Sequence, residues 1–414
     1  MYLHHLKAIG MFFGVSAGAL TVSALSAPPA HAWTFIDLAS AAQCTGAMVN
    51  DAGSVVGFCG VNDARQGFLR ELTGRSSIVL APLVQPPCIA EGISNGAAGA
   101  ETIVGWCADA NGEHQAVFWN SATPTTAPTL LQPLSILGVK DKQTGPKAVN
   151  ASGVIVGDSL NNNGTKSPVV WSSTGAVTEL PGGLLESDAN CVPVDINDAA
   201  TPSIIGNCPS SSANGANVAV LWASATSGYS VLPVPSGGAC SADKINDNGQ
   251  ILGDCAFADD SHSAVLWAAG GGSAPTVLTS VGGTATRTVA VDINNSGLVA
   301  GNYLSAAGFI QPYSWNTAGG GTNASAIAPP GGTSAFAVTI GVGGNGEMVG
   351  FYKTTAGVFH PFHVVSGSTS AVDDGTPQGG PGTIITSISK GGLYKAAVSE
   401  DTSEHTHTDM QSTP

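Results

Sequence analysis

A nine-residue motif recurs along the chain and constrains its fold more than any other feature. It consists of an apolar residue, Asn, a polar pair and Gly, followed by a short β-favouring run that ends in a second Gly. One copy reads Ile245-Asn246-Asp247-Asn248-Gly249-Gln250-Ile251-Leu252-Gly253. Alignment of the second glycine of each copy gives Gly57, Gly105, Gly157, Gly206, Gly253, Gly301 and Gly350. The spacings are 48, 52, 49, 47, 48 and 49 residues, so the chain contains seven repeats.

A second anchor follows each motif and keeps the same period. It is a strand-like run that ends in Trp in five repeats, at Trp119, Trp171, Trp222, Trp267 and Trp315. Each period holds four β-like runs, which in the fifth repeat cover residues 240–245, 250–255, 262–267 and 275–279. Four strands in a repeat of this length are typical of a β-propeller blade. A β-solenoid is the alternative, but the close Asn-Asp-x-Gly turn predicts antiparallel neighbours.

The two ends of the chain supply further strand-like runs that predict how the propeller closes. Residues 34–38 resemble the fourth strand of a repeat, and residues 383–388 and 393–398 resemble the first two strands of an eighth. One strand, seven sets of four and two more give 31 strands. We therefore predict an all-β propeller with seven full blades and a closing blade from both termini, and favour eight blades over seven. The propeller domain is expected over residues 33–398, followed by a disordered polar tail over residues 399–414.

The first 32 residues have the organisation of a secretory signal. A short start with one lysine precedes an apolar run, and Ala30-His31-Ala32 is a small-x-small cleavage site after Ala32. No later segment has the length of apolar sequence that a membrane-spanning helix needs. Only 13 residues are Lys or Arg and the net charge is −15, which excludes a nucleic-acid partner and disfavours an anionic bilayer surface. We expect a secreted, periplasmic or cell-surface protein.

The eight cysteines occupy repeated positions, which allows their pairing to be predicted. Cys44, Cys191 and Cys240 each lie six residues before the turn Asn, and Cys59, Cys107, Cys208 and Cys255 each lie two residues after the second Gly. Cys88 completes the second repeat. A tight turn places these two positions opposite each other on adjacent strands, and export permits the bonds. We predict the disulfides Cys44–Cys59, Cys88–Cys107, Cys191–Cys208 and Cys240–Cys255.

The two anchors together resemble the HAF family of probable extracellular repeats, whose units pair an Ile-Asn-x-x-Gly turn with a His-Ala-Phe-like strand. The turn half matches at Ile245-Asn246 and Ile293-Asn294, whereas only His360 occupies the family's His position. The resemblance implies an exported repeat protein without an assigned activity, and it supplies no catalytic residues.

Other polar residues give no catalytic, cofactor or metal site from sequence alone. The turn Asn and Asp lack the oxygen spacing and the Glu of a calcium loop, so they are expected to accept backbone hydrogen bonds. The repeated Trp residues are expected to pack between blades rather than to stack sugars. His360 and His363 lack the spacing of a metal site, and the pairs Asp259-Asp260 and Asp373-Asp374 are interpreted as loop dipeptides.

These observations favour an exported, non-enzymatic binding or surface scaffold for an unidentified extracellular glycan or protein. The alternative is a propeller hydrolase or lyase that acts on extracellular glycans. That alternative requires several carboxylates or histidines to converge at one end of the central channel.

Overall fold

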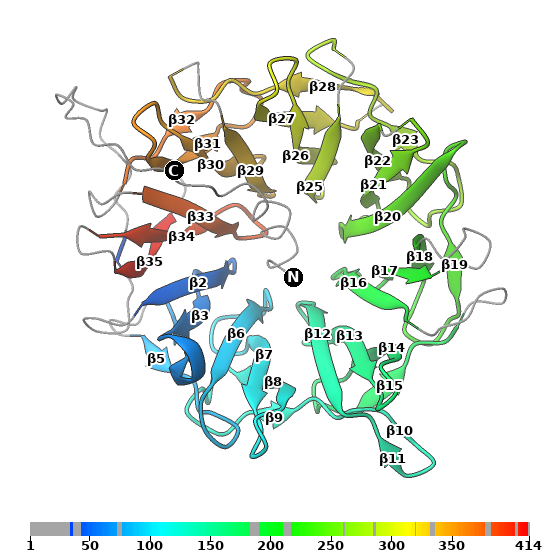
Figure 1. Cartoon of the computed structure of the whole chain (residues 1–414), viewed down its shortest axis with the longest axis vertical. Helices are drawn as coiled ribbons and strands as arrows, with labels where there is room; N and C mark the ends of the chain where they lie inside the picture. Colours follow the sequence, from blue (N-terminus) through cyan, green and yellow to red (C-terminus); the bar gives the residue numbers. More distant parts are fainter. Residues whose placement is uncertain are drawn as a thin grey trace.

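Eight four-stranded antiparallel blades surround a central channel in the computed structural model of the protein (Figure 1). The structure describes residues 34–35, 43–72, 77–182, 190–209, 217–259, 261–284, 287–318, 320–331, 336–376, 382–401 and 405–412. The predicted signal segment and its cleavage site at Ala32 lie outside the described residues. The predicted propeller is confirmed, and it has eight blades.

The first four blades follow one another along the chain, each with its first strand innermost. Blade 1 contains β2 (Cys44–Val49), β3 (Val55–Cys59), β4 (Gln66–Arg70) and β5 (Ile78–Val79), with the 3-10 turn η2 (Asn62–Ala64) between β3 and β4. Blade 2 contains β6 (Cys88–Ile93), β7 (Thr102–Ala108), β8 (His114–Asn120) and β9 (Thr129–Leu130). The hairpin of β10 (Ser135–Ile136) and β11 (Val139–Lys140) precedes blade 3, which contains β12 (Gln143–Val149), β13 (Ile155–Leu160), β14 (Lys166–Trp171) and β15 (Val177–Glu179). Blade 4 contains β16 (Val192–Ile196), β17 (Ile204–Pro209), β18 (Asn217–Trp222) and β19 (Tyr229–Val231).

The next three blades repeat the same order. Blade 5 contains β20 (Gly238–Ile245), β21 (Ile251–Phe257), β22 (His262–Trp267) and β23 (Thr276–Val277). Blade 6 contains β25 (Thr288–Ile293), β26 (Leu298–Leu304), β27 (Ile310–Asn316) and β28 (Asn323–Ala326), and β24 (Ser280–Val281) pairs with β28 in parallel. Blade 7 contains β29 (Ala337–Val342), β30 (Met348–Lys353), β31 (Phe359–Val364) and β32 (Val372–Asp373).

Blade 8 is the closing blade and combines the two ends of the chain. Its strands are β33 (Gly382–Ile388), β34 (Tyr394–Glu400), β35 (Thr406–Ser412) and, outermost, β1 (Thr34–Phe35). The prediction of a disordered tail over residues 399–414 is wrong, because β35 pairs with β34 along its whole length. The 31 strands predicted from the sequence are therefore one fewer than eight blades of four strands require. The strand missing from the prediction is β35.

The polar sequence of β35 explains why it escaped prediction. Its run Thr406-His407-Thr408-Asp409-Met410-Gln411-Ser412 has one large apolar residue and no apolar alternation. Thr408, Asp409, Met410 and Gln411 are nevertheless buried, and Ser399 donates a hydrogen bond to Asp409. Burial of this strand thus depends on polar contacts that only the assembled closing blade provides.

Each inner strand contains a β-bulge, which accounts for the second glycine of the motif. In β20 the bulge lies between Ala242 and Lys244, opposite Gly253. A Cβ atom at Gly253 would lie 2.0 Å from the Ser241 carbonyl oxygen and 2.8 Å from the Trp267 ring. No side chain fits there, so the glycine is required by the bulged backbone rather than by the turn.

The repeated Trp residues fill the wedges between blades, as predicted. All five are at most 1% exposed. Trp267 packs with Leu221 and Leu232 of the preceding blade, and its Nε1 donates to the Pro233 carbonyl at 2.7 Å. Burial of these five rings in clusters shared with the preceding blade links the five blades that carry them to their neighbours.

The structure contains the four predicted disulfides. Three of them join directly opposite residues of an inner strand and the next strand, and in the fourth Cys191 lies one residue before β16. The Cα–Cα separations are 4.0 to 4.1 Å. The equivalent pairs without cysteine include Thr144 with Ser159 and Thr288 with Tyr303. Four disulfides are consistent with an extracellular or periplasmic protein. Within the described residues, no helix has the length and apolar character to cross a membrane.

Candidate ligand-binding site: the central channel

The inner strands enclose a cavity of about 1630 Å³ along the axis of the ring. Its two ends differ in structure. The inner strands begin at the end where the four disulfides lie, which we call the disulfide face. They end at the Asn-containing turns, which form the turn face. Residues of all eight inner strands line the cavity, so it is the place where the blades bring distant parts of the sequence together.

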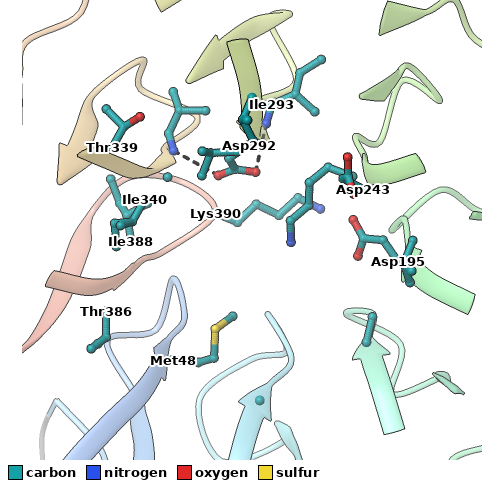
Figure 2. Close-up of a pocket in the computed structure, with 18 of the residues that line it drawn as sticks. Met48, Asp195, Asp243, Asp292, Ile293, Thr339, Ile340, Thr386, Ile388 and Lys390 are labelled. Carbon is teal, nitrogen blue, oxygen red and sulfur yellow. Dashed lines mark hydrogen bonds between the residues drawn. The ribbon is translucent and has the colours of Figure 1, made fainter. Parts of the chain in front are cut away.

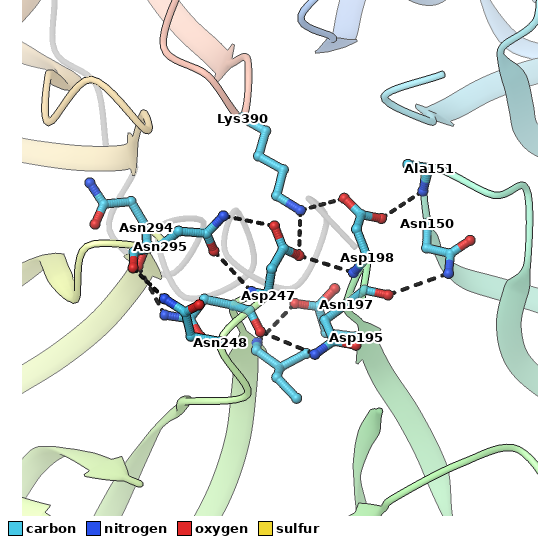
Figure 3. Close-up of polar contacts among 12 residues, drawn as sticks. Asn150, Ala151, Asp195, Asn197, Asp198, Asp247, Asn248, Asn294, Asn295 and Lys390 are labelled. Atoms are coloured by element: carbon cyan, nitrogen blue, oxygen red, sulfur yellow. Dashed lines mark hydrogen bonds and ion pairs between the residues drawn. The ribbon is translucent and has the colours of Figure 1, made fainter. Parts of the chain in front are cut away.

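On the turn face, the Asn of the motif caps its own turn and also holds the next blade (Figure 3). The Asn246 Oδ1 atom accepts a hydrogen bond from the Gln250 N–H at 2.9 Å, as the sequence predicts. Its Nδ2 atom donates to the Asn294 carbonyl of blade 6 at 3.0 Å, a role that was not predicted. The same inter-blade bond runs from Asn150 to Asn197 (3.3 Å), from Asn197 to Asn246 (3.2 Å) and from Asn294 to Gly343 (2.9 Å). These side chains are therefore structural, and the described residues contain no cluster of metal-binding side chains.

The residue after each Asn takes part in a second set of hydrogen bonds between blades on the turn face. The Asp198 N–H donates to Asp247 Oδ1 at 2.9 Å, and the Asp247 N–H donates to Asn295 Oδ1 at 2.9 Å. Asp198 itself accepts from the Ala151 N–H at 2.6 Å. The acidic side chains of the turn face thus have backbone partners in the neighbouring blade.

Lys390 crosses the turn face from blade 8 to the opposite side of the ring (Figure 3). Its ammonium group contacts Asp198 of blade 4 and lies 2.7 Å from Asp247 Oδ1 of blade 5. Burial would lower the pKa of Lys390, but the two carboxylates outweigh it and raise that pKa. The Lys390 side chain therefore spans the turn end of the channel.

Close to the turn face, charged residues stand at one equivalent position of three successive blades. Asp195, Lys244 and Asp292 each lie two residues before the turn Asn. Burial raises the pKa of Asp195 and of Asp292, against the opposing charge of Lys244. Asp195 accepts from the Ile245 N–H at 3.1 Å, and Asp292 accepts from the Val342 N–H at 3.0 Å. Each of these carboxylates therefore joins its own blade to the next one.

Asp243 occupies the bulge of β20 and is paired with Asp254 on β21. Burial raises the pKa of Asp243 to about 7, although its hydrogen bond with Asp254 and the charge of Lys244 act in the opposite direction. Burial, and then the charge of Asp243, raises the pKa of Asp254 well above its usual range. Two adjacent buried carboxylates cannot both ionise easily, so the pair retains a proton near neutral pH. Asp254 also accepts from the Ala290 N–H at 2.9 Å.

Apolar side chains line another part of the channel wall. Met48 of blade 1, Ile340 of blade 7 and Ile388 of blade 8 lie across from Asp195 and Asp243 (Figure 2). The cavity is therefore amphipathic, with its carboxylates mainly on blades 4 to 6 and these apolar side chains on blades 7, 8 and 1, where Lys353 and Lys390 also line it.

Towards the disulfide face, the wall on blades 6 and 7 is aromatic and cationic. The rings of Phe336, Phe351 and Phe359 form one cluster with centroids 5.8 to 6.2 Å apart. The Lys353 ammonium lies 5.6 Å from the centroid of Phe359, and Arg287 lines the cavity at the start of β25. This combination can hold a ligand that is partly apolar and partly anionic.

The structure also changes the interpretation of the histidines and of the carboxylate pair Asp373-Asp374. Pairing of β32 with β31 places Asp373 3.1 Å from His360 and Asp374 2.6 Å from His363. Asp374 also contacts the buried Lys395 of blade 8 at 2.8 Å. The prediction of a bare loop dipeptide is wrong, because Asp373 ends β32 and Asp374 joins His363 and Lys395 in a buried polar contact between blades 7 and 8. No histidine occurs among the described residues that line the channel.

His114, Trp106 and Arg65 lie outside the lining of the channel. His114 stacks on Trp106 with ring centroids 3.8 Å apart, and Arg65 covers Trp106 at 5.4 Å. The channel residues that sequence reasoning missed had one recognisable signal, since Asp195, Lys244 and Asp292 alternate in charge at one repeat position. Lys390 had none, because its partners lie 143 and 192 residues away.

The chain matches no protein-family model and no curated protein sequence. It is similar in structure to a puromycin hydrolase, with a TM-score of 0.51 and 14% identity over 85% of this chain and 57% of that one. A puromycin hydrolase mutant in complex with PGG gives a TM-score of 0.51 and 13% identity over 91% of this chain and 62% of that one. The β-propeller domain of the Trilobed protease from Pyrococcus furiosus gives a TM-score of 0.48 and 11% identity over 83% of this chain and 97% of that one. At these identities the similarity extends to the fold alone, and the chain is a β-propeller.

Proposed function

We propose that this protein is an exported, non-enzymatic binding protein that holds an extracellular ligand in its central channel. The observation that carries the proposal is the amphipathic cavity of about 1630 Å³, which Lys390 spans at the turn face. Concave sites with an apolar wall and a few converging polar groups are the usual places for ligands.

The partners of the channel carboxylates favour binding over catalysis. Asp195 and Asp292 accept backbone N–H groups of the next blade, and Asp198 and Asp247 hold Lys390 and the neighbouring turns. A carboxylate that holds the ring together in this way is a poor proton carrier, because a change in its charge would disturb the blade contact. The convergence of acids at the channel therefore has a structural explanation.

Export and membership of the HAF repeat family are part of the same proposal. The signal-like first 32 residues and the four disulfides support an oxidising destination, either the periplasm, the cell surface or the medium. The Asn turns support the family, since Asn246 and its equivalents perform one repeated task in the ring.

The second candidate is a hydrolase or lyase that acts on extracellular glycans, and one observation favours it. Asp243 has a raised pKa of about 7, faces the channel, and shares a proton with Asp254. Pairs of carboxyl groups whose pKa values are pushed apart are typical of acid–base catalysts.

One experiment separates the two candidates. The purified mature protein is titrated calorimetrically with panels of peptides and oligosaccharides, and each mixture is then analysed for products by mass spectrometry. A binding protein should give saturable heat without products, and the Asp243→Asn variant should bind equally well. Product formation that falls by orders of magnitude in Asp243→Asn would support the enzyme, and absence of any ligand that competes for the channel would contradict the proposal.

A further inference from the structure

The cations of this acidic chain gather in its channel. The net charge is −15 and only 13 residues are Lys or Arg. Six of these 13 line the cavity, namely Lys147, Lys166, Lys244, Arg287, Lys353 and Lys390. Five of the 28 acidic residues line it, namely Glu91, Asp195, Asp198, Asp243 and Asp292. The described lining therefore carries a formal charge of +1, opposite in sign to the charge of the whole chain.

The positive charge is concentrated towards the disulfide face. Arg287 precedes the first residue of β25 and Lys353 ends β30, and both positions lie at that face. Lys166 begins β14 at the same face, but its ammonium group pairs with Asp158 at 3.3 Å. The carboxylates that line the cavity stand at the bulges, at the repeat position of Asp195 and Asp292, or on the turn face. A cationic opening in an otherwise acidic protein attracts anions and repels cations before contact.

Apolar side chains border the same opening. Val289 is 48% exposed, Leu304 is 40% exposed and Phe309 is 44% exposed, and all belong to blade 6 or its loop. They continue the cluster of Phe336, Phe351 and Phe359, which is joined to the blade 6 loop by the bridge between Ile310 and Phe336. Exposed apolar patches beside a cavity usually mark a site that a ligand covers.

We infer that the disulfide-face half of the channel binds a peptide through a carboxylate and an adjacent large apolar side chain. This inference rests on the proposed function. The carboxylate would lie against Arg287 and Lys353, and the apolar side chain against the phenylalanine cluster. Asp195, Asp243 and Asp292 deeper in the channel would repel a second anion, so the anionic end of the peptide stays near the opening.

Two features favour a peptide over an acidic oligosaccharide. The repeated Trp residues, which would offer flat surfaces to sugar rings, are at most 1% exposed. Phe359 meets Phe336 and Phe351 edge-on at 79° and 78°, so the cluster forms a pocket for a side chain rather than a flat platform. The volume of about 1630 Å³ also exceeds that of usual small-molecule sites, ~300–1,000 Å³, and suits an extended chain.

The test is calorimetric titration of the mature protein with a short peptide that ends in two phenylalanines. The free carboxylate form should bind about threefold to tenfold more tightly than its C-terminal amide. The Arg287→Gln/Lys353→Gln double variant should lose that preference and bind both forms equally. Lys142→Gln, at an exposed position outside the channel, is the matched control and should behave as the wild type.

Other outcomes separate this inference from the proposed function. Equal affinity of the wild type for the acid and the amide, or failure to bind either, would overturn the inference. Tight binding of an oligogalacturonate that the double variant does not weaken, but that Ile340→Trp in the channel wall abolishes, would overturn it and leave channel binding intact. Similar unfolding temperatures of the variants, measured in parallel, would show that they are folded.

Discussion

The inter-blade hydrogen bond of the turn Asn can be tested at Asn246. This side chain is 3% exposed and makes three hydrogen bonds, to the Gln250 N–H (2.9 Å), the Gln250 Oε1 atom (2.8 Å) and the Asn294 carbonyl (3.0 Å). Each is worth about 0.5–1.5 kcal/mol net. In Asn246→Ala, the Asn294 carbonyl keeps its hydrogen bond from the Gly297 N–H at 3.1 Å, and the polar groups of Gln250 can reach solvent because Gln250 is partly exposed. The substitution therefore leaves neither residue with a buried polar group that lacks a partner. We expect a loss of about 2–3 kcal/mol.

The variant Asn246→Asp separates the turn cap from the inter-blade link. Its carboxylate still accepts from the Gln250 N–H, but it presents an oxygen to the Asn294 carbonyl where the amide donated. We expect Asn246→Asp to be destabilised at least as much as Asn246→Ala. Guanidinium unfolding followed by tryptophan fluorescence measures both. Stability of Asn246→Asp equal to that of the wild type would refute the inter-blade role and leave only the turn cap.

Three further predictions concern the blades and the channel. Gly253→Ala should cost about 1–3 kcal/mol or more, because its Cβ would lie 2.0 Å from the Ser241 oxygen, whereas Gly272→Ala, with no atom within 4 Å, should be neutral in the same unfolding assay. Replacement of both Cys240 and Cys255 by Ala should lower the free energy of unfolding by about 3 kcal/mol, and an unchanged unfolding midpoint would contradict a constraining bond. Because the pKa of Asp243 is raised to about 7, the folded protein holds a proton that the unfolded chain releases near its ordinary pKa of about 3.9. Its contribution to stability should therefore decline as pH rises from about 4 to 7, and equal pH dependence in wild type and Asp243→Asn would show that this proton is absent.

Repetition explains why so much of the fold could be predicted from one sequence. The pairing of Cys240 with Cys255 and the burial of Trp267 depend on the period-two facing of a hairpin and on a position that recurs in every blade. Such local rules hold whatever the rest of the ring does. These rules were sufficient to predict the blades and the disulfides. They could not predict the polar strand β35, because its burial depends on the closing blade.

The channel could not be predicted in the same way, because its contacts are not periodic. Lys390 meets Asp198 and Asp247 only because blade 8 stands across the ring from blades 4 and 5. The number of blades fixes that geometry, and no sequence spacing does. The proton shared by Asp243 and Asp254 likewise depends on burial at a bulge, which the apolar pattern of β20 does not reveal.

The central claim is that the ligand of this protein lies inside the channel, and a crystal structure of the mature protein with a bound peptide tests it most directly. We expect the peptide between β25 and β29, near the disulfide face, with its carboxylate beside Arg287 and Lys353 and an apolar side chain on Phe359. A peptide bound at the outer edge of a blade, with an empty channel, would contradict it.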